Sequence, residues 1–318
     1  LTAVAPPAQA AAAAGTATDD AKAWLLRIRD AADKRNYQGT LVISAGGEVS
    51  SSRVEHYYDG QGTFERVDGL DGERRRSLRH DEQLQTLWPA NRVALIEHRE
   101  ALRPFPALPG SGHEQIFASY EVKLDGQDRV AGHAARVLLL QPRDEARFAQ
   151  RLWADTDSGL LLRSEVLDAQ GRVLESASFT EVRIGVRPQA DAIAKAMKQL
   201  DGYRVLRPQT LATSLDAEGW KLAVPIGGFK LVHCMRRVFD GGGERAGGPV
   251  LQALYSDGLT HVSVFVEPYR AQAHKPVEAA MGATHTLTQR RGEGWWMTVM
   301  GDVPIATLRR FANALERR

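Results

Sequence analysis

The chain has 318 residues, about twice the length typical of a single domain, so we expect two domains. Hydrophobic residues make up 43% and charged residues 25% of the sequence, as in ordinary globular proteins. The formal net charge of +2 is too small to indicate a nucleic-acid partner. Cys234 is the only cysteine, which excludes an intrachain disulfide, and we expect it to be a buried, unreactive thiol.

Residues 1–18 allow two interpretations. Ala8-Gln9-Ala10 has the small-x-small form of a secretory cleavage site, which would make this segment a signal remnant. A disordered, low-complexity leader would have the same alanine-rich composition. We favour export. No later run reaches the roughly 18 apolar residues of a membrane span, so the sequence predicts a soluble, exported protein.

Residues 19–35 are predicted to form a helix that packs its apolar face on the sheet that follows. Trp24, Leu25 and Ile28 recur at helical spacing behind Thr18 and Asp19, which are good N-caps. Beyond the helix, apolar and polar residues alternate between Asp and Gly turns, which predicts strands. These strands span residues 37–44, 51–58, 64–67, 73–79, 84–88 and 92–98.

Residues 101–119 interrupt the strand pattern with Pro104, Pro106 and Pro109, which exclude the segment from the interior of a sheet. The segment is too long for a simple turn. It either covers the mouth of the sheet, with Phe105 pointing inward, or makes a loose excursion. The sequence favours neither interpretation.

Residues 120–184 predict an antiparallel meander of four or five strands. Short alternating runs are closed by Asp and Gly at 125–126, 155–159 and 168–171, and short turns join antiparallel neighbours. With the earlier strands this makes roughly ten in one run, and half-closing such a sheet hides its edges. The predicted fold is mainly β with an α+β part: a half-open, curved antiparallel sheet or barrel with a helix on its concave side.

A linker is predicted at 187–219, after a sheet domain at 19–186. Pro188 ends the sheet, a short helix is expected at 191–200, and the following residues look extended and polar. A small α+β domain is expected at 220–318, with a final helix opened by Pro304. Its strands are predicted around 231–239, 250–255, 259–267, 284–290 and 295–300.

The sequence contains no catalytic constellation. There is no G-x-S-x-G elbow and no H-E-x-x-H pair, and the glycine-rich loop at 240–248 lacks the Gly-Lys-Ser/Thr of a P-loop. His233 and Cys234 are adjacent, so they point to opposite faces of a strand and make a poor metal pair. We therefore predict no enzyme activity, no metal and no cofactor.

An ordered set of short motifs resembles the RseB/MucB family, periplasmic regulators of the sigma-E envelope-stress response. In the first domain the motifs are Tyr37-Gln38-Gly39-Thr40, Leu87-Trp88-Pro89, Arg129-Val130-Ala131-Gly132, Gln141-Pro142-Arg143-Asp144 and Asp157-Ser158-Gly159-Leu160. In the second they are Met235-Arg236-Arg237, Ser256-Asp257-Gly258-Leu259, residues 262–268 (VSVFVEP) and residues 298–304 (TVMGDVP). The match runs from about Asp19 to the C-terminus.

The resemblance implies a periplasmic regulator whose first domain is similar to the lipoprotein carriers LolA and LolB. Such a protein binds the periplasmic region of a membrane-anchored anti-sigma factor of the RseA/MucA type and shields it from regulated proteolysis. Lipid, lipoprotein acyl chains or lipopolysaccharide are implied as the signals that release the partner. A homo-oligomer is left open. The alternative is a periplasmic lipid or lipoprotein carrier, although a carrier needs only the first domain.

Two sets of candidate site residues complete this hypothesis. The first set would line a lipid pocket beside the helix, unless its members simply pack the core: Trp24, Ile28, Trp88, Phe105, Phe117, Val137, Leu139 and Trp153. The second set would contact the partner, because arginine and aromatic residues commonly anchor interfaces: Arg236, Arg237, Tyr269, Trp295 and Trp296. Trp295 and Trp296 are adjacent, so one ring is expected in the core and the other outside.

Overall fold

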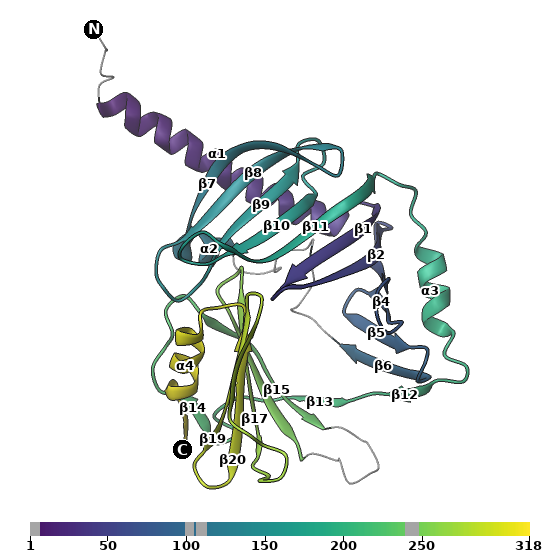
Figure 1. Cartoon of the computed structure of the whole chain (residues 1–318), viewed down its shortest axis with the longest axis vertical. Helices are drawn as coiled ribbons and strands as arrows, with labels where there is room; N and C mark the ends of the chain where they lie inside the picture. The colour runs from purple at the N-terminus through teal and green to yellow at the C-terminus, as the bar shows by residue number, and fades with distance from the viewer. Residues whose placement is uncertain (1–6, 99–104, 106–112, 239–247) are drawn as a thin grey trace.

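The computed structural model describes residues 7–98, 105, 113–238 and 248–318, which form two large sheets and a small two-stranded one, with few helices (Figure 1). Helix α1 (Pro7–Lys34) includes all but the last residue of the helix predicted at 19–35. It begins earlier, at Pro7, because the alanine-rich run before Asp19 has high helix propensity. Residues 7–18 are therefore helical, which differs from the disordered leader considered above. None of the helices in the described ranges has the length and hydropathy of a membrane span.

The first sheet has twelve strands in the order β12-β6-β5-β4-β3-β2-β1-β11-β10-β9-β8-β7. The strands before α2 (His113–Ser119) are β1 (Tyr37–Ala45), β2 (Glu48–Tyr58), β3 (Thr63–Gly69), β4 (Arg76–His80), β5 (Gln83–Trp88) and β6 (Val93–His98). Those after it are β7 (Tyr120–Val130), β8 (His133–Pro142), β9 (Ala149–Asp155), β10 (Leu161–Leu167) and β11 (Val173–Ile184). β12 (Arg204–Leu206) joins β6 in parallel. The order is not circular, so the predicted half-open, curved sheet is confirmed.

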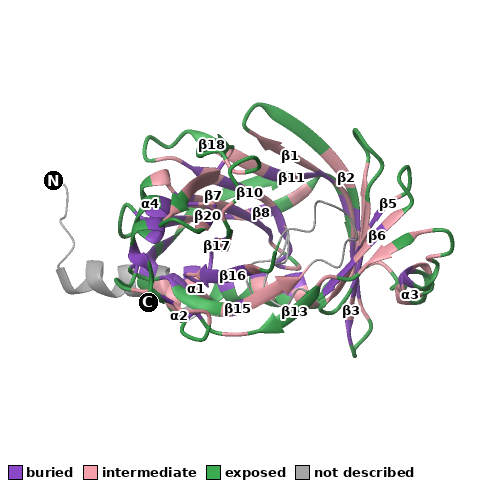
Figure 2. Cartoon of the chain, turned by 90° about the horizontal axis from the view of Figure 1, so that it is seen from below, coloured by how far each residue is buried: buried purple, intermediate pink, exposed green. Residues whose placement is uncertain are grey.

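The two faces of this sheet carry different helices. Ala177, Ser164 and Leu152 lie directly opposite one another on β11, β10 and β9, and so share a face. Leu152 packs with Leu25 of α1, which places α1 on that face. α3 (Ala190–Lys198) packs against the opposite face, near β3 and β4. Seen from below, the sheet curls around the side that carries α1 and leaves α3 outside (Figure 2).

The second sheet has seven strands in the order β13-β15-β16-β17-β20-β19-β18. Its strands are β13 (Gln209–Ala212), β15 (Lys230–Val238), β16 (Val250–Ser256), β17 (His261–Pro268), β18 (Val277–Met281), β19 (Thr284–Arg291) and β20 (Trp295–Gly301). α4 (Ile305–Ala314) covers one face, beside a small sheet of β14 (Trp220–Leu222) and β21 (Leu315–Arg317). This is the predicted small α+β domain.

The segment predicted as a linker contributes a strand to each sheet. Leu206, at the end of β12, lies opposite Leu95 in the first sheet. Gln209, at the start of β13, lies opposite Val238 in the second sheet. The unpaired chain between these strands is therefore only Arg207 and Pro208.

Each domain also contributes to the core of the other. Leu259 of the second domain belongs to the apolar cluster that contains α1. Ala146, from the loop between β8 and β9, belongs to the cluster that contains α4, and Oγ1 of Thr307 donates a 2.8 Å hydrogen bond to its carbonyl oxygen. The two domains are thus packed on each other as well as joined by the chain.

Candidate functional site

An apolar cluster beneath α1, which we name the α1 cluster, is the first candidate site. Its buried members are Ala21, Leu25, Ile28, Ile116, Tyr120, Val122, Leu138, Leu140, Leu152, Ala154, Leu161 and Leu259. They come from α1, α2, four strands of the first sheet and a turn of the second domain. An apolar surface between a helix and the concave face of a sheet has the chemistry that an apolar ligand needs, while the buried members of the cluster pack against one another.

Four of the eight residues predicted to line a lipid pocket meet at this cluster. Ile28 is fully buried in it, and Trp24, Phe105 and Phe117 are half-buried against its surface. The Phe105 ring also lies 5.6 Å from the ring of Phe179 on β11. Phe105 therefore points inward, toward the concave face. The other residues of the proline-rich segment from 101 to 112 lie outside the described ranges.

The other four residues do not join the α1 cluster. Val137 lies opposite Trp153, whereas the next pair, Leu138 and Leu152, faces α1. Because side chains alternate along a strand, Val137, Leu139 and Trp153 point to the opposite face. The Trp153 indole N–H donates there to Oδ2 of Asp128 at 2.9 Å. Val137 and Trp153 pack in a neighbouring apolar cluster with Phe179, and Phe105 contacts this cluster as well as the α1 cluster. A lipid pocket that includes these residues stays a prediction.

Trp88 lies on β5, which is separated in the strand order from the strands β7 to β10 that form the α1 cluster. Its neighbour Leu87 packs with Ile193 of α3, so Trp88 points from β5 to the other face, the one that carries α1. It is half-buried and belongs to none of the apolar clusters among the described residues.

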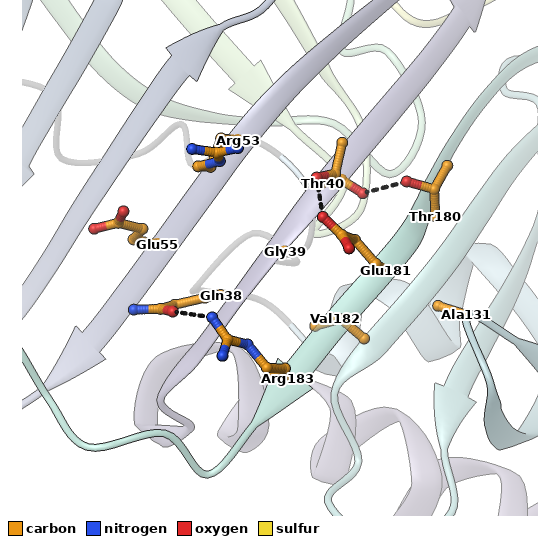
Figure 3. A pocket seen from close by; sticks show the side chains of 10 residues that line it. All are labelled: Gln38, Gly39, Thr40, Arg53, Glu55, Ala131, Thr180, Glu181, Val182 and Arg183. Atoms are coloured by element: carbon orange, nitrogen blue, oxygen red, sulfur yellow. Dashed lines mark hydrogen bonds between the residues drawn. The ribbon is translucent and has the colours of Figure 1, made fainter.

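A polar hollow of 430 Å³ lies on the sheet surface at β1, β2 and β11 (Figure 3). Its walls include two arginines and two glutamates, Arg53, Arg183, Glu55 and Glu181. Several of these groups contact neighbouring polar groups: Thr40 Oγ1 donates to Glu181 at 2.8 Å, and Arg183 donates to Gln38 at 3.0 Å. Most of its lining is polar, and only Val182 and Ala131 add apolar side chains, so the hollow offers less for lipid than the α1 cluster does.

The two domains meet at a buried ion pair, which forms the centre of what we name the interdomain joint. Arg147 precedes β9, and its Nε lies 2.8 Å from Oδ2 of Asp257 in the second domain. The two side chains are 1% and 0% exposed. Arg147 Nη2 also donates to the carbonyl oxygen of Gly227 at 2.8 Å, and Nη1 lies 2.5 Å from Asp144.

Backbone and aromatic groups complete the joint. Asp257 Oδ1 accepts the N–H groups of Leu259 and Thr260 at 2.9 and 2.8 Å. The hydroxyl of Tyr120 donates to Oδ2 of Asp257 at 3.2 Å, and burial raises the pKa of this phenol well above its usual range. The guanidinium of Arg147 also lies 5.0 Å from the Phe229 ring centroid. The buried charges are thus both paired and hydrogen-bonded, as burial requires.

The residues of this joint are only weakly marked in the sequence. Asp144 and Asp257 belong to two of the motifs that resemble the RseB/MucB family, but aspartate is common in turns, and Asp257 stands beside a glycine as in many turns. Nothing in the order of residues pairs Asp257 with Arg147, which is 110 positions away.

The two arginines predicted to contact a partner already hold carboxylates. Arg236 Nη2 lies 2.6 and 2.7 Å from the two carboxylate oxygens of Glu218, and its side chain remains 42% exposed. Arg237 lies 3.2 Å from Glu97 of the first domain, with side-chain exposures of 17% and 8%. Arg236 therefore retains an accessible surface, whereas Arg237 spans the two domains.

The aromatic residues of the second set are more buried than the sequence suggests. Trp295 is half-buried against the α4 side of the sheet, with the Arg317 guanidinium 4.4 Å from its ring. Trp296 points to the other face and is 4% exposed, stacked on His274 at 4.8 Å. The expectation of an exposed outer ring is wrong, because the segment after β17 covers it. Tyr269 of that segment is half-buried, 4.5 Å from Arg290.

The residues that the structure describes contain no group of three or more His, Cys, Asp or Glu side chains placed to hold a metal ion. Cys234 is buried, as predicted, and burial raises the pKa of its thiol to about 11. A thiol with such a pKa is not a nucleophile near neutral pH.

Comparison with known proteins places these features in a family. Residues 20–197 match the model of the MucB/RseB N-terminal domain, and residues 214–316 match that of the MucB/RseB C-terminal domain. This chain belongs to the MucB/RseB family. Among MucB/RseB proteins, MucB of Pseudomonas aeruginosa, named a sigma factor AlgU regulatory protein, is 30% identical over 305 residues, covering 94% of this chain and 92% of that protein. RseB of Escherichia coli, named a sigma-E factor regulatory protein, is 23% identical and covers 95% and 92%.

Solved MucB structures share the arrangement of both domains. A structure of the Pseudomonas aeruginosa MucA/MucB complex matches with a TM-score of 0.72 and 28% identity, covering 94% of this chain and 99% of that one. A structure of MucB in complex with MucA(peri) matches with a TM-score of 0.70 and 27% identity at the same coverage. The family resemblance seen in the sequence motifs is thus confirmed.

Proposed function

We propose that this chain is a periplasmic negative regulator that binds the periplasmic region of a MucA-type anti-sigma factor and protects it from regulated proteolysis. The observation that carries the proposal is the match to two MucA-bound MucB structures over 94% of the chain, through both domains. The joint around Arg147 and Asp257 supports it, because a binding surface spread over two domains needs them in a fixed relationship.

Lipid-type signals are the second part of the proposal. The α1 cluster lies on the concave face of the first sheet, and Trp24, Phe105 and Phe117 are only partly buried at its margin. An acyl chain entering there would bury apolar surface that now contacts water, which stabilises the bound state by about 25 cal/mol per Å². Lipid bound at this margin then releases the partner.

The experiment that tests the regulator function uses the purified full chain and the periplasmic region of the MucA-type protein from the same organism. Isothermal titration calorimetry should give saturable binding, and the bound partner should be cut more slowly by a broad-specificity protease. An unrelated periplasmic domain of similar charge serves as the control. Absence of binding, or equal cleavage rates with and without this chain, would contradict the proposal.

A lipid or lipoprotein carrier is the competing function, and the α1 cluster is the observation in its favour. A carrier should bind lipid and deliver it to an acceptor without any need for the second domain. The interdomain joint argues against this, because Leu259 of the second domain completes the α1 cluster itself. Lipid transfer to acceptor vesicles, with no binding of the MucA-type protein, would favour the carrier.

A further inference from the structure

The two domains also touch where two hairpin turns cross, apart from the interdomain joint. The turn between β1 and β2 contains Gly46, and the turn between β18 and β19 contains Gly282, so β18 lies beside the end of β1 (Figure 2). A Cβ added to Gly46 would lie 3.0 Å from the backbone nitrogen of Gly282. One added to Gly282 would lie 2.8 Å from Cβ of Ala45. The turns therefore meet backbone to backbone, and we name this contact of Gly46 and Gly282 the glycine latch.

The latch needs glycine for two separate reasons. Gly46 and Gly282 both have φ of +61°, a backbone angle that glycine adopts readily, and any side chain on either residue would meet the other turn. Two other turn glycines separate these reasons. Gly47 and Gly292 have φ of +87° and +59°, yet each has open space around its Cβ position. A positive φ is thus common to the hairpin turns, whereas the close approach is a property of the latch.

A carboxyl group lies at the edge of the latch. Glu175 is half-buried on β11 opposite Ala45, and its Oε2 lies 3.1 Å from the Cβ position of Gly282. Burial and the negative charge of Asp302, which follows β20, raise the pKa of this carboxyl. A backbone N–H donated by Ala283 offsets part of the rise. The closed latch therefore brings together acidic groups from the two domains.

The other titratable groups near the latch do not neutralise these two carboxylates near neutral pH. His261 interacts with Asp302, but burial lowers the pKa of its imidazole, which is therefore uncharged at that pH. His285 of β19 contacts a backbone carbonyl oxygen through Nδ1 at 2.8 Å. Glu48, at the start of β2, is exposed and adds another negative charge. Ionisation of Glu175 thus opposes the contact between the turns.

We propose that the glycine latch is an acid-responsive device, closed when Glu175 is protonated and loosened when Glu175 is ionised. A carboxyl that binds its proton more tightly in the closed form favours that form as the pH falls, as linkage requires. Acid therefore closes the latch and base loosens it. The ion pair of Arg147 and Asp257 holds the domains in both forms, so loosening is a hinge movement of one sheet relative to the other. This behaviour belongs to the free chain and does not depend on the proposed function.

The first test measures the separation of the two turns in the free full chain. Val49 on β2 and Val277 on β18 are exposed, so cysteines placed there accept spin labels, while the buried Cys234 stays unlabelled. Double electron–electron resonance should show a short-distance population that grows several-fold from about pH 8 to about pH 5. Carboxylates with the ordinary glutamate pKa of about 4.3 stay mostly ionised throughout this range. Distances that do not change with pH would overturn the inference.

Matched variants identify the group that responds to pH. Glu175→Gln keeps an acceptor for the Ala283 N–H but has no charge, so the short-distance population should dominate at both pH values. Glu48→Gln removes an exposed carboxylate beside the same turn and should respond to pH as the wild type does. A pH response that persists in Glu175→Gln would assign it to another group, such as His261, and would also overturn the inference.

The contact itself is tested by adding a methyl group. Gly282→Ala should abolish the short-distance population at both pH values, whereas Gly292→Ala, with nearly the same φ and open space, should behave as the wild type does. Circular dichroism checks that each variant is folded. If Gly282→Ala does not fold, Gly46→Ala makes the same test, with Gly47→Ala as its control. A folded latch variant that keeps the wild-type distances would show that the turns do not form this contact.

Discussion

Arg147 and Asp257, from different domains, form an ion pair of 2.8 Å in which neither side chain is more than 1% exposed. A pair this deeply buried is held by its hydrogen bonds as much as by its charges, and removal of one partner leaves the other charge uncompensated. The relative placement of the two sheets therefore depends on a few atoms at their junction.

Asp257→Ala should lower the free energy of unfolding by about 3–5 kcal/mol, because Arg147 loses its buried carboxylate. Urea denaturation of the full chain measures this. The control is Glu278→Ala, which removes an ion pair between Glu278 and Arg309 with side-chain exposures of 44% and 55%. That pair is solvent-exposed and should contribute about 0–1 kcal/mol. Equal effects of the two substitutions would mean that the joint does not hold the domains.

Gly228→Ala should disturb the same joint from the other side. A Cβ at Gly228 would lie 2.5 Å from Nη2 of Arg147, and the residue has φ of +80°. Two controls separate the causes: Gly202 has φ of +79° with open space around it, and Gly227 has open space without a positive φ. Gly202→Ala should lower the free energy of unfolding by about 1–2 kcal/mol through the backbone alone, and Gly227→Ala should leave it nearly unchanged. Gly228→Ala should lower it by more than either control, as measured by urea denaturation. A value for Gly228→Ala no larger than that for Gly202→Ala would show that Arg147 moves aside freely.

A cut in the chain between the domains should not separate them. Among residues 187–218, limited proteolysis is expected to act first near Arg207 and Pro208, because the flanking strands are paired in their sheets. Since Leu259 and Ala146 each belong to the core of the other domain, the fragments should elute together in gel filtration. Mass spectrometry locates the cut. Fragments that elute separately without denaturant would refute the packed interface, and a first cut inside residues 130–181 would contradict the domain division.

Phe105→Ala and Phe117→Ala should each weaken the binding of a fluorescent fatty acid about tenfold, the effect of losing one large apolar contact. Both rings are half-buried at the margin of the α1 cluster, so the fold should lose little stability. Leu139→Ala is the matched control, since Leu139 is half-buried on the opposite face of the same sheet. If all three variants bind the probe alike, the α1 cluster is a packed core and not a lipid site.

Lipid should lower the affinity for the partner, and the partner should lower the affinity for lipid by the same factor. If lipid releases the partner, then a saturating amount of the partner's periplasmic region must lower lipid affinity equally, as linkage requires. Two titrations measure this: lipid with and without partner, and partner with and without lipid. Equal lipid affinities in both conditions would show that the sites are uncoupled, even if both ligands bind.

Much of the fold follows from local chemistry in the sequence. Asp and Gly turns, such as the one at 168–171, separate runs of alternating residues and correctly predict strands of the central meander. Asp125-Gly126, also predicted as a turn, lies instead inside β7, where the register with β8 shifts. The half-open sheet and the α+β domain follow from the number of such runs. The strands that were not predicted carry little pattern: β13 and β18 are exposed along their whole length, so no alternation marks them.

The candidate lining was harder to predict because of register. The run Val137-Leu138-Leu139-Leu140 is apolar at every position, so the pattern alone does not decide which residues face α1. The structure decides it by pairing Leu138 with Leu152. The burial of Trp296 was hard to predict for a similar reason. Its ring stacks on His274, which lies 22 positions earlier and is brought over the strand by a turn, and no sequence periodicity indicates this contact.

The two-residue connection between β12 and β13 limits how the domains can move. From Leu206 to Gln209 the chain spans three residue steps, which reach roughly 10 Å when fully extended, and Pro208 fixes one of the few free backbone angles. The connection is therefore a short tether beside a pivot, with almost no slack. Such a connection favours rotation of the domains about this edge over their separation, because its full reach is about the width of one helix.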